Sequence, residues 1–200
     1  MNILKHLGLT FRAVSRHLAA AFLGVLGVIV ETIQAPRLVY EFECIGPDGQ
    51  VKWRERIHNL VTNVGKADLV TNYFKGSAYT AAFYVGLIDS TGYTSGAAAG
   101  DTMASHGGWT TENQSYSNGT RPSLTLGSVT GTTTASVDNS ASKASYSING
   151  TATIKGAFVT TNSTKGGTTG TLYSAGTFTG GDRGVSSGDT LNVQVTLQVS

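Results

Sequence analysis

The residue types of a nucleophilic catalytic triad come closest together at Asp101, Ser105 and His106. In a triad the histidine accepts the proton of the serine hydroxyl, and the aspartate orients the histidine. Triads are assembled across a fold, however, and a segment rich in Ser and Gly brings such residues together by chance. These three residues therefore give little reason to expect a hydrolase.

Four aspartates lie in Gly- and Ser-rich segments, where carboxylates bind hard cations such as Ca²⁺: Asp89, Asp101, Asp182 and Asp189. No pair of them has the spacing of a known cation-binding loop, and aspartates in such segments more often cap turns. The chain also lacks the HExxH, paired-cysteine, GxGxxG and phosphate-loop motifs. We therefore expect no catalytic residues, no metal, no cofactor and no enzymatic activity.

Aromatic side chains offer another kind of chemistry, the stacking of rings on a ligand or partner. The segment 89–122 is long, consists mostly of Gly, Ser, Thr, Ala and Asn, and carries Trp109 and Tyr116. Loops of this length inside a compact domain are uncommon and tend to be binding loops. The sequence thus predicts a contact loop at Trp109 and Tyr116, and it leaves a receptor- or carbohydrate-binding module open.

The clearest structural pattern is the alternation of apolar and polar residues from Leu191 to Val199. Successive side chains of an extended strand point to opposite faces. The pattern therefore predicts a strand with one apolar face, which a second sheet must cover. Residues 187–190, just before it, have the composition of a tight turn.

A β-hairpin is predicted over 37–57, because two alternating runs flank a Pro-Asp-Gly turn. We expect the acidic residues of the first run to pair across the strands with the basic residues of the second: Glu41, Glu43, Lys52, Arg54 and Arg56. Each exposed pair of this kind contributes about 0.2–1 kcal/mol.

Beyond the hairpin, a short helix is predicted over 63–75 with Asn63 as its N-cap, and strands follow from 79 onward. Leu124 and Leu126 begin one of these strands, and Gly156 marks a change of phase typical of a bulge. Short strands at regular spacing predict a mainly β fold, an antiparallel β-sandwich or jelly-roll-like domain over 37–200.

The composition supports this fold class and excludes some functions. Only 13% of the 200 residues are charged, and the net charge is +2. Nucleic-acid binding needs clustered Lys and Arg, so we expect no nucleic-acid partner. The single cysteine, Cys44, rules out an internal disulfide and is expected to be a small core residue.

Residues 1–36 form a separate part of the predicted organisation, because thirteen uncharged and largely apolar residues, 18–30, follow a short basic stretch. We expect an apolar helix, which is too short to cross a bilayer of roughly 30 Å. Three roles stay open: an assembly arm buried against another subunit, a membrane-active segment, and an uncleaved secretory signal. The arm residues are Leu18, Phe22, Leu23, Val25, Leu26, Val28, Ile29 and Val30.

Several strings of this chain resemble a family of small structural proteins from tailed bacteriophages. They are Ala78–Asp89, Ala99–Trp109, Tyr116–Pro122, Asn162–Tyr173 and Ser187–Val195, and the resemblance covers roughly residue 51 to the end. It implies a virion component, assembled in the host cytoplasm, and it does not imply which component.

From this resemblance we expect a non-enzymatic, accessory capsid-decorating or neck- and tail-associated subunit. Its expected partners are capsid, portal or tail subunits and further copies of itself. Membrane contact through residues 18–30 stays open. Two alternatives also stay open: a receptor- or carbohydrate-binding module of a tail appendage, and a secreted or membrane-associated surface protein.

Overall fold

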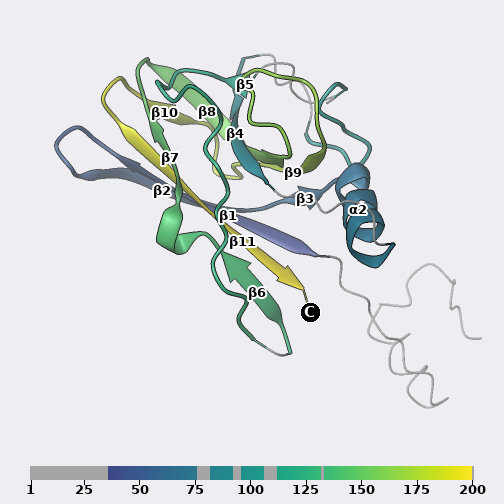
Figure 1. Cartoon of the computed structure of the whole chain (residues 1–200). Helices are drawn as coiled ribbons and strands as arrows, with labels where there is room; N and C mark the ends of the chain where they lie inside the picture. Colours follow the sequence, from purple (N-terminus) through teal and green to yellow (C-terminus); the bar gives the residue numbers. More distant parts are fainter. Residues whose placement is uncertain (1–35, 76–81, 92–95, 106–111, 132, 200) are drawn as a thin grey trace, which may run out of the picture. The chain divides into compact units, whose positions relative to one another are not determined.

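The computed structural model describes residues 36–75, 82–91, 96–105, 112–131 and 133–199 (Figure 1). Contacts divide the chain into Met1–Gln34 and Ala35–Ser200, and every element described below belongs to the second unit. The predicted N-terminal helix, the arm residues 18–30 and Trp109 lie outside the described residues.

The described part is mainly β and contains two antiparallel sheets. In the first sheet β1 and β11 are central, and both β6 and β7 pair with the far side of β11. The strands of the first sheet, in spatial order, are β2 (Val51–His58), β1 (Arg37–Ile45), β11 (Thr190–Val199) and β6 (Ala135–Asp138), and β7 (Ala144–Ser147) pairs with the first part of β11.

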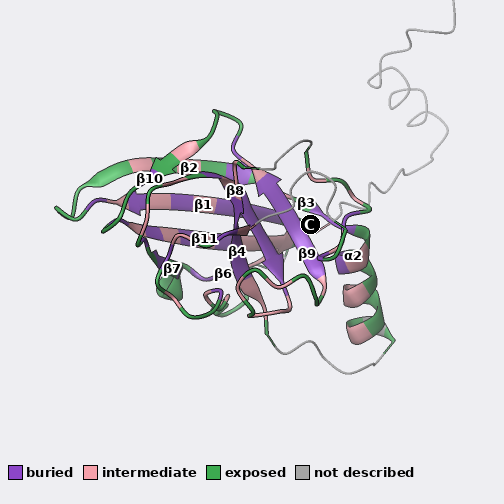
Figure 2. Cartoon of the chain, turned by 90° about the horizontal axis from the view of Figure 1, so that it is seen from above, coloured by how far each residue is buried: buried purple, intermediate pink, exposed green. Residues whose placement is uncertain are grey.

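The second sheet is built around β8, which pairs with β4 and β9, and also with the short strand β10. Its strands are β3 (Leu60–Val61), β9 (Leu172–Thr177), β8 (Ala152–Thr160), β4 (Tyr84–Asp89), β5 (Glu112–Asn113) and β10 (Arg183–Val185). Figure 2 shows that β8 and β9 are buried over most of their length, whereas much of β2 is exposed. The mainly β, antiparallel prediction is thus confirmed.

The predicted last strand is confirmed as β11, and its apolar face meets the other sheet. Leu191, Val193 and Val195 are fully buried in a core to which residues of both sheets contribute. Two tyrosines of the first sheet also reach the second: the Tyr40 hydroxyl lies 2.6 Å from the Ser174 Oγ, and the Tyr146 hydroxyl donates to the Val85 carbonyl at 2.7 Å. Buried polar groups need such partners, so these bonds fix how the sheets face each other.

Asn139 completes the first sheet where β6 gives way to β7. Its side-chain oxygen accepts from the Val195 N–H at 2.7 Å, and its amide nitrogen donates to the Val193 carbonyl at 3.3 Å. Unpaired backbone groups in a core are costly. The Asn139 side chain therefore takes the place of a neighbouring strand and satisfies the backbone of β11 between β6 and β7.

The predicted short helix is present as α2 (Asn63–Leu69), which continues into a π-helical turn, η2 (Val70–Phe74). Its N-cap is Thr62 and not the predicted Asn63. The Thr62 hydroxyl accepts from the Gly65 N–H at 3.1 Å and donates to the Leu172 carbonyl of β9. Thr62 is the N-cap because its hydroxyl both caps the helix and anchors it to the second sheet.

The change of phase at Gly156 is confirmed as an irregularity in β8. Ile88 pairs with Gly156 and Asp89 pairs with Ile154, so Lys155 is left out of the ladder with β4. A Cβ atom on Gly156 would collide with the backbone oxygen of Gly176 in β9. The backbones of β8 and β9 therefore approach too closely for any other residue here.

We predict that Gly156→Ala lowers the free energy of unfolding by about 1–3 kcal/mol, because backbone atoms cannot rotate away from the added methyl group. Gly184→Ala is the matched control, since a Cβ atom there meets no atom within 4 Å. Urea unfolding of both variants, followed by tryptophan fluorescence, measures the difference. Equal stability of the two variants would contradict this packing.

Candidate functional site

An apolar groove of about 400 Å³ opens where β1 begins and β11 ends. Its floor consists of side chains that also belong to the core: Leu38, Val159, Tyr173 and Val195. Residues of both sheets contribute to this floor, so the groove is an opening of the core itself.

The walls of the groove are exposed apolar side chains. Tyr73 of η2 is 73% exposed, and Val129 and Leu126 of the segment between β5 and β6 are 69% and 38% exposed. Single exposed apolar residues need no explanation, but a contiguous apolar surface marks a site of interaction. The groove is therefore the strongest candidate for a binding site in the described residues.

The π-helical turn places Tyr73 at the groove. The Lys75 N–H donates to the Val70 carbonyl five residues earlier, at 3.1 Å, so the last turn is wider than an α-helical turn. Turns of this kind occur frequently at functional sites. Deeper in the groove, burial raises the pKa of the Tyr173 phenol, and the nearby Asp68 carboxylate raises it further.

The segment with Leu124 and Leu126 corrects one prediction. Their alternation predicted a strand, but residues 124–129 form none, and both leucines line the groove. The Leu124 N–H donates to the Phe83 carbonyl at 2.8 Å, and no ladder continues from there. The two leucine side chains contact the open end of the core. They are partly covered there without the partner sheet that an alternating strand would need.

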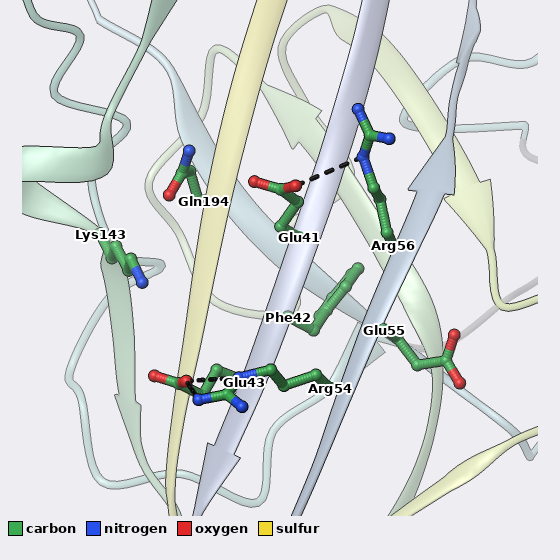
Figure 3. Close-up of a pocket in the computed structure, with 8 residues that line it drawn as sticks. All are labelled: Glu41, Phe42, Glu43, Arg54, Glu55, Arg56, Lys143 and Gln194. Atoms are coloured by element: carbon green, nitrogen blue, oxygen red, sulfur yellow. Dashed lines mark hydrogen bonds and ion pairs between the residues drawn. The ribbon is translucent and has the colours of Figure 1, made fainter. Parts of the chain in front are cut away.

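The solvent-facing side of the first sheet carries the predicted charge pairs (Figure 3). Glu43 and Arg54 lie opposite each other and pair at 2.5 Å, and Glu41 and Arg56 pair at 3.3 Å. They border a shallow depression of about 440 Å³, which Lys143 also lines. Because each arginine faces a carboxylate, this surface is not a basic patch, and exposed pairs of this kind contribute little stability.

Lys52 does not join these pairs. Its ammonium group lies 2.6 Å from the Asp189 carboxylate, which is 1% exposed at the turn before β11. The thiol of Cys44 donates to the same carboxylate oxygen at 3.6 Å, so Cys44 is the buried core residue that was predicted. Burial, followed by the charge of Asp189, raises the pKa of the Cys44 thiol to about 11.

A buried ion pair holds together two loops beside the second sheet. Arg121 and Glu112 are 1% and 3% exposed, and the guanidinium binds both carboxylate oxygens at 2.8–3.1 Å. Arg121 also donates to the carbonyls of Asn162 and Gly167, each at 2.8 Å. One side chain thus fixes two loops that are more than forty residues apart in the sequence.

The predicted contact loop is corrected in part. Tyr116 is fully buried, packs edge-on against Tyr146 at 4.9 Å and donates its hydroxyl to Glu112, so its ring offers no stacking surface. Burial, then the charge of Glu112, raises the pKa of the Tyr116 phenol well above its usual value. Trp109 lies outside the described residues, as does His106 of the possible triad.

The aspartates considered as cation ligands cap turns or form pairs. Asp101 accepts from the Ala98 N–H at 2.8 Å, Asp89 from the Thr91 N–H at 2.7 Å, and Asp182 pairs with Lys155 at 3.0 Å. Across the described ranges, no three His, Cys, Asp or Glu side chains gather in a group able to hold a metal ion.

Two features of the site were missed by sequence reasoning. Glu112 and Arg121 are nine residues apart in a segment without periodicity, so no pattern indicated that they pair. The groove was missed because its lining comes from parts of the chain that are far apart in the sequence, from Leu38 to Leu197. Val129, an apolar residue between polar neighbours, was the one available signal.

Comparisons of this chain with protein-family models, with curated proteins and with solved structures found no match. Within the part of the chain that the structure describes, no helix has the length and hydropathy needed to cross a bilayer. The class that the fold and site define is therefore a mainly β protein with an open apolar groove.

We predict that Arg121→Met destabilises the protein by about 3–5 kcal/mol, because it leaves the buried Glu112 carboxylate without its countercharge. The control is Arg54→Met, which removes an exposed pair and should cost no more than about 1 kcal/mol. Urea unfolding measures both. An effect of Arg121→Met as small as that of the control would refute a structural role for the buried pair.

Acid stability offers a separate test at Asp189. Burial raises the pKa of its carboxyl, but hydrogen bonds from Lys52 and the Ser186 N–H outweigh burial and place the pKa below its usual value. A carboxyl whose pKa is depressed by folding contributes stability above its unfolded pKa of about 3.9. This contribution is lost as the pH falls through the folded pKa.

We therefore predict that Asp189→Asn is less stable than the parent at pH 7 and loses less stability below about pH 4. Lys52→Met should also reduce the loss of stability at low pH, because it removes the main hydrogen bond that lowers the pKa of Asp189. Urea midpoints at a series of pH values test this. If Asp189→Asn lost as much stability at low pH as the parent, Asp189 would not be the source of this pH dependence.

Proposed function

We propose that this chain is a non-enzymatic structural protein of a tailed-bacteriophage virion. In this proposal it is an accessory capsid-decorating or neck- and tail-associated subunit, and it assembles through its N-terminal arm and its two-sheet body. Its partners are capsid, portal or tail subunits and further copies of itself. The observation that carries the proposal is the apolar groove at the open end of the core.

The groove supports an assembly role because the described unit leaves part of its own core uncovered. Leu38 and Val195 are buried, but Leu126, Val129 and Tyr73 around them stand in solvent. Burying apolar surface yields roughly 25 cal/mol per Å², which a partner gains on covering this groove, less the cost of ordering. A subunit that works inside a particle has such a partner permanently.

The resemblance to tailed-bacteriophage proteins supports the proposal through the position of its strings. Arg121, in Tyr116–Pro122, donates to two carbonyls of Asn162–Tyr173, and the Val85 N–H in Ala78–Asp89 donates to the Pro122 carbonyl at 3.0 Å. Three of the five resembling strings thus contact one another at the second sheet, and a fourth, Ser187–Val195, contains most of β11 in the first sheet. A resemblance to structural proteins is expected to involve residues of the packed two-sheet body.

The proposal includes the finer fold. Two antiparallel sheets with one core between their facing sides are the architecture of a β-sandwich, and we propose that this one is of the jelly-roll-like type. The paired charges on the outer face of the first sheet also suit close packing beside other subunits, because they leave no strong field of one sign.

The test is the composition of purified particles of the phage whose genome encodes this chain. We expect peptides of the chain in density-purified virions at a fixed ratio to the major capsid protein, as measured by quantitative mass spectrometry. The control is a replication protein from the same genome, which should be depleted from the particles. Depletion of this chain to the level of that control would overturn the proposal.

A further inference from the structure

We propose that the apolar groove between η2, the segment 124–129 and the ends of β1 and β11 binds residues 18–30 of a second copy of this chain. The inference rests on the proposed function, because it names the contact through which copies of an assembly subunit join. It commits the groove to one occupant, the uncharged segment that the same sequence carries near its start.

The first argument is the concentration of exposed apolar residues at the groove. Seven large apolar residues are exposed in the described residues, and Tyr73, Leu126 and Val129 among them line the groove. Val199 follows Leu197 of the groove on the same face of β11, and Val70 lies on the same helical turn as Tyr73. An occupant of this surface must be apolar over more than one residue.

The second argument is the match with the chain's own apolar segment. Residues 18–30 contain no charge and carry Phe22, Leu23 and Leu26, which are the kind of side chain that such a groove accepts. Among the described residues Asp68 is the one charged residue of the groove lining, and Arg16 lies two positions before Leu18, so the charges are complementary.

The third argument concerns which copy supplies the segment. β1 starts at Arg37 and runs away from the groove, whose floor includes Leu38. Only residues 31–36 separate Val30 from this strand, and at full extension they span about 20 Å. A return into the same groove would use most of these six residues for the reversal, since a β-turn alone takes four residues. The segment of a neighbour meets no such restriction.

Disulfide trapping between unlike copies tests the proposal directly. One full-length form carries Val129→Cys, and a second, distinguished by an affinity tag, carries Leu26→Cys. Cys44 stays in place, because it is buried. After mixing and mild oxidation, we expect a disulfide-linked heterodimer of the two forms. The matched control replaces Val129→Cys by Ser187→Cys, an exposed position at the opposite end of β11, and should yield little product.

The same contact should govern self-association. We expect Leu126→Asp, and separately a chain starting at Pro36, to weaken self-association at least about tenfold in analytical ultracentrifugation. Near-ultraviolet circular dichroism checks that each variant keeps its tertiary fold. Ser187→Asp, an exposed change away from the groove, should associate like the parent.

Each result has a defined meaning. If Leu26→Cys/Val129→Cys in one chain links only within that chain, even in concentrated mixtures, the groove takes its own segment and the second-copy proposal fails. No linkage above the Ser187→Cys control also overturns it. Neither outcome removes the chain from purified virions, so failure of this inference is distinguishable from failure of the proposed function.

Discussion

The fold depends on one constraint, which is that the apolar face of β11 must be covered. This strand pairs with β1 on one side and with β6 and β7 on the other, so its backbone is satisfied within the first sheet. Its buried side chains then require a second sheet, and the two tyrosine hydroxyls that reach Ser174 and Val85 fix that sheet's position. Hydrophobic burial supplies the stability, and the hydrogen bonds supply the single arrangement.

The same constraint explains the position of the groove. Leu191, Val193 and Val195 are fully buried, whereas Leu197 is only half-buried and Val199 is 45% exposed. The second sheet therefore covers the start of β11 and leaves its end open. The helical turn η2 and the segment 124–129 stand beside this end without closing it. The groove is thus the unfinished part of an otherwise continuous core, and an intermolecular contact there would extend the core.

Sequence reasoning succeeded where a local pattern determines the structure. The alternation in β11, the hairpin turn and the Glu41–Arg56 pair all follow from residues close to one another or from strand register. It failed where a distant residue decides. Thr62 caps the helix because Leu172 lies beside it, and Tyr116 is buried because Glu112 accepts its hydroxyl. Likewise, Leu124 and Leu126 alternate as a strand would, but the open core end takes their side chains.

In the proposed assembly, the body and the arm have different tasks. The edge strand β2 carries Lys52, Arg54 and Arg56, and charged edges resist pairing with the sheet of another subunit. Contact through the groove is then favoured over edge-to-edge growth. Because the arm of one copy enters the groove of the next, the contact is heterologous, and repeated contacts close into a ring or continue as a filament according to the rotation between neighbours.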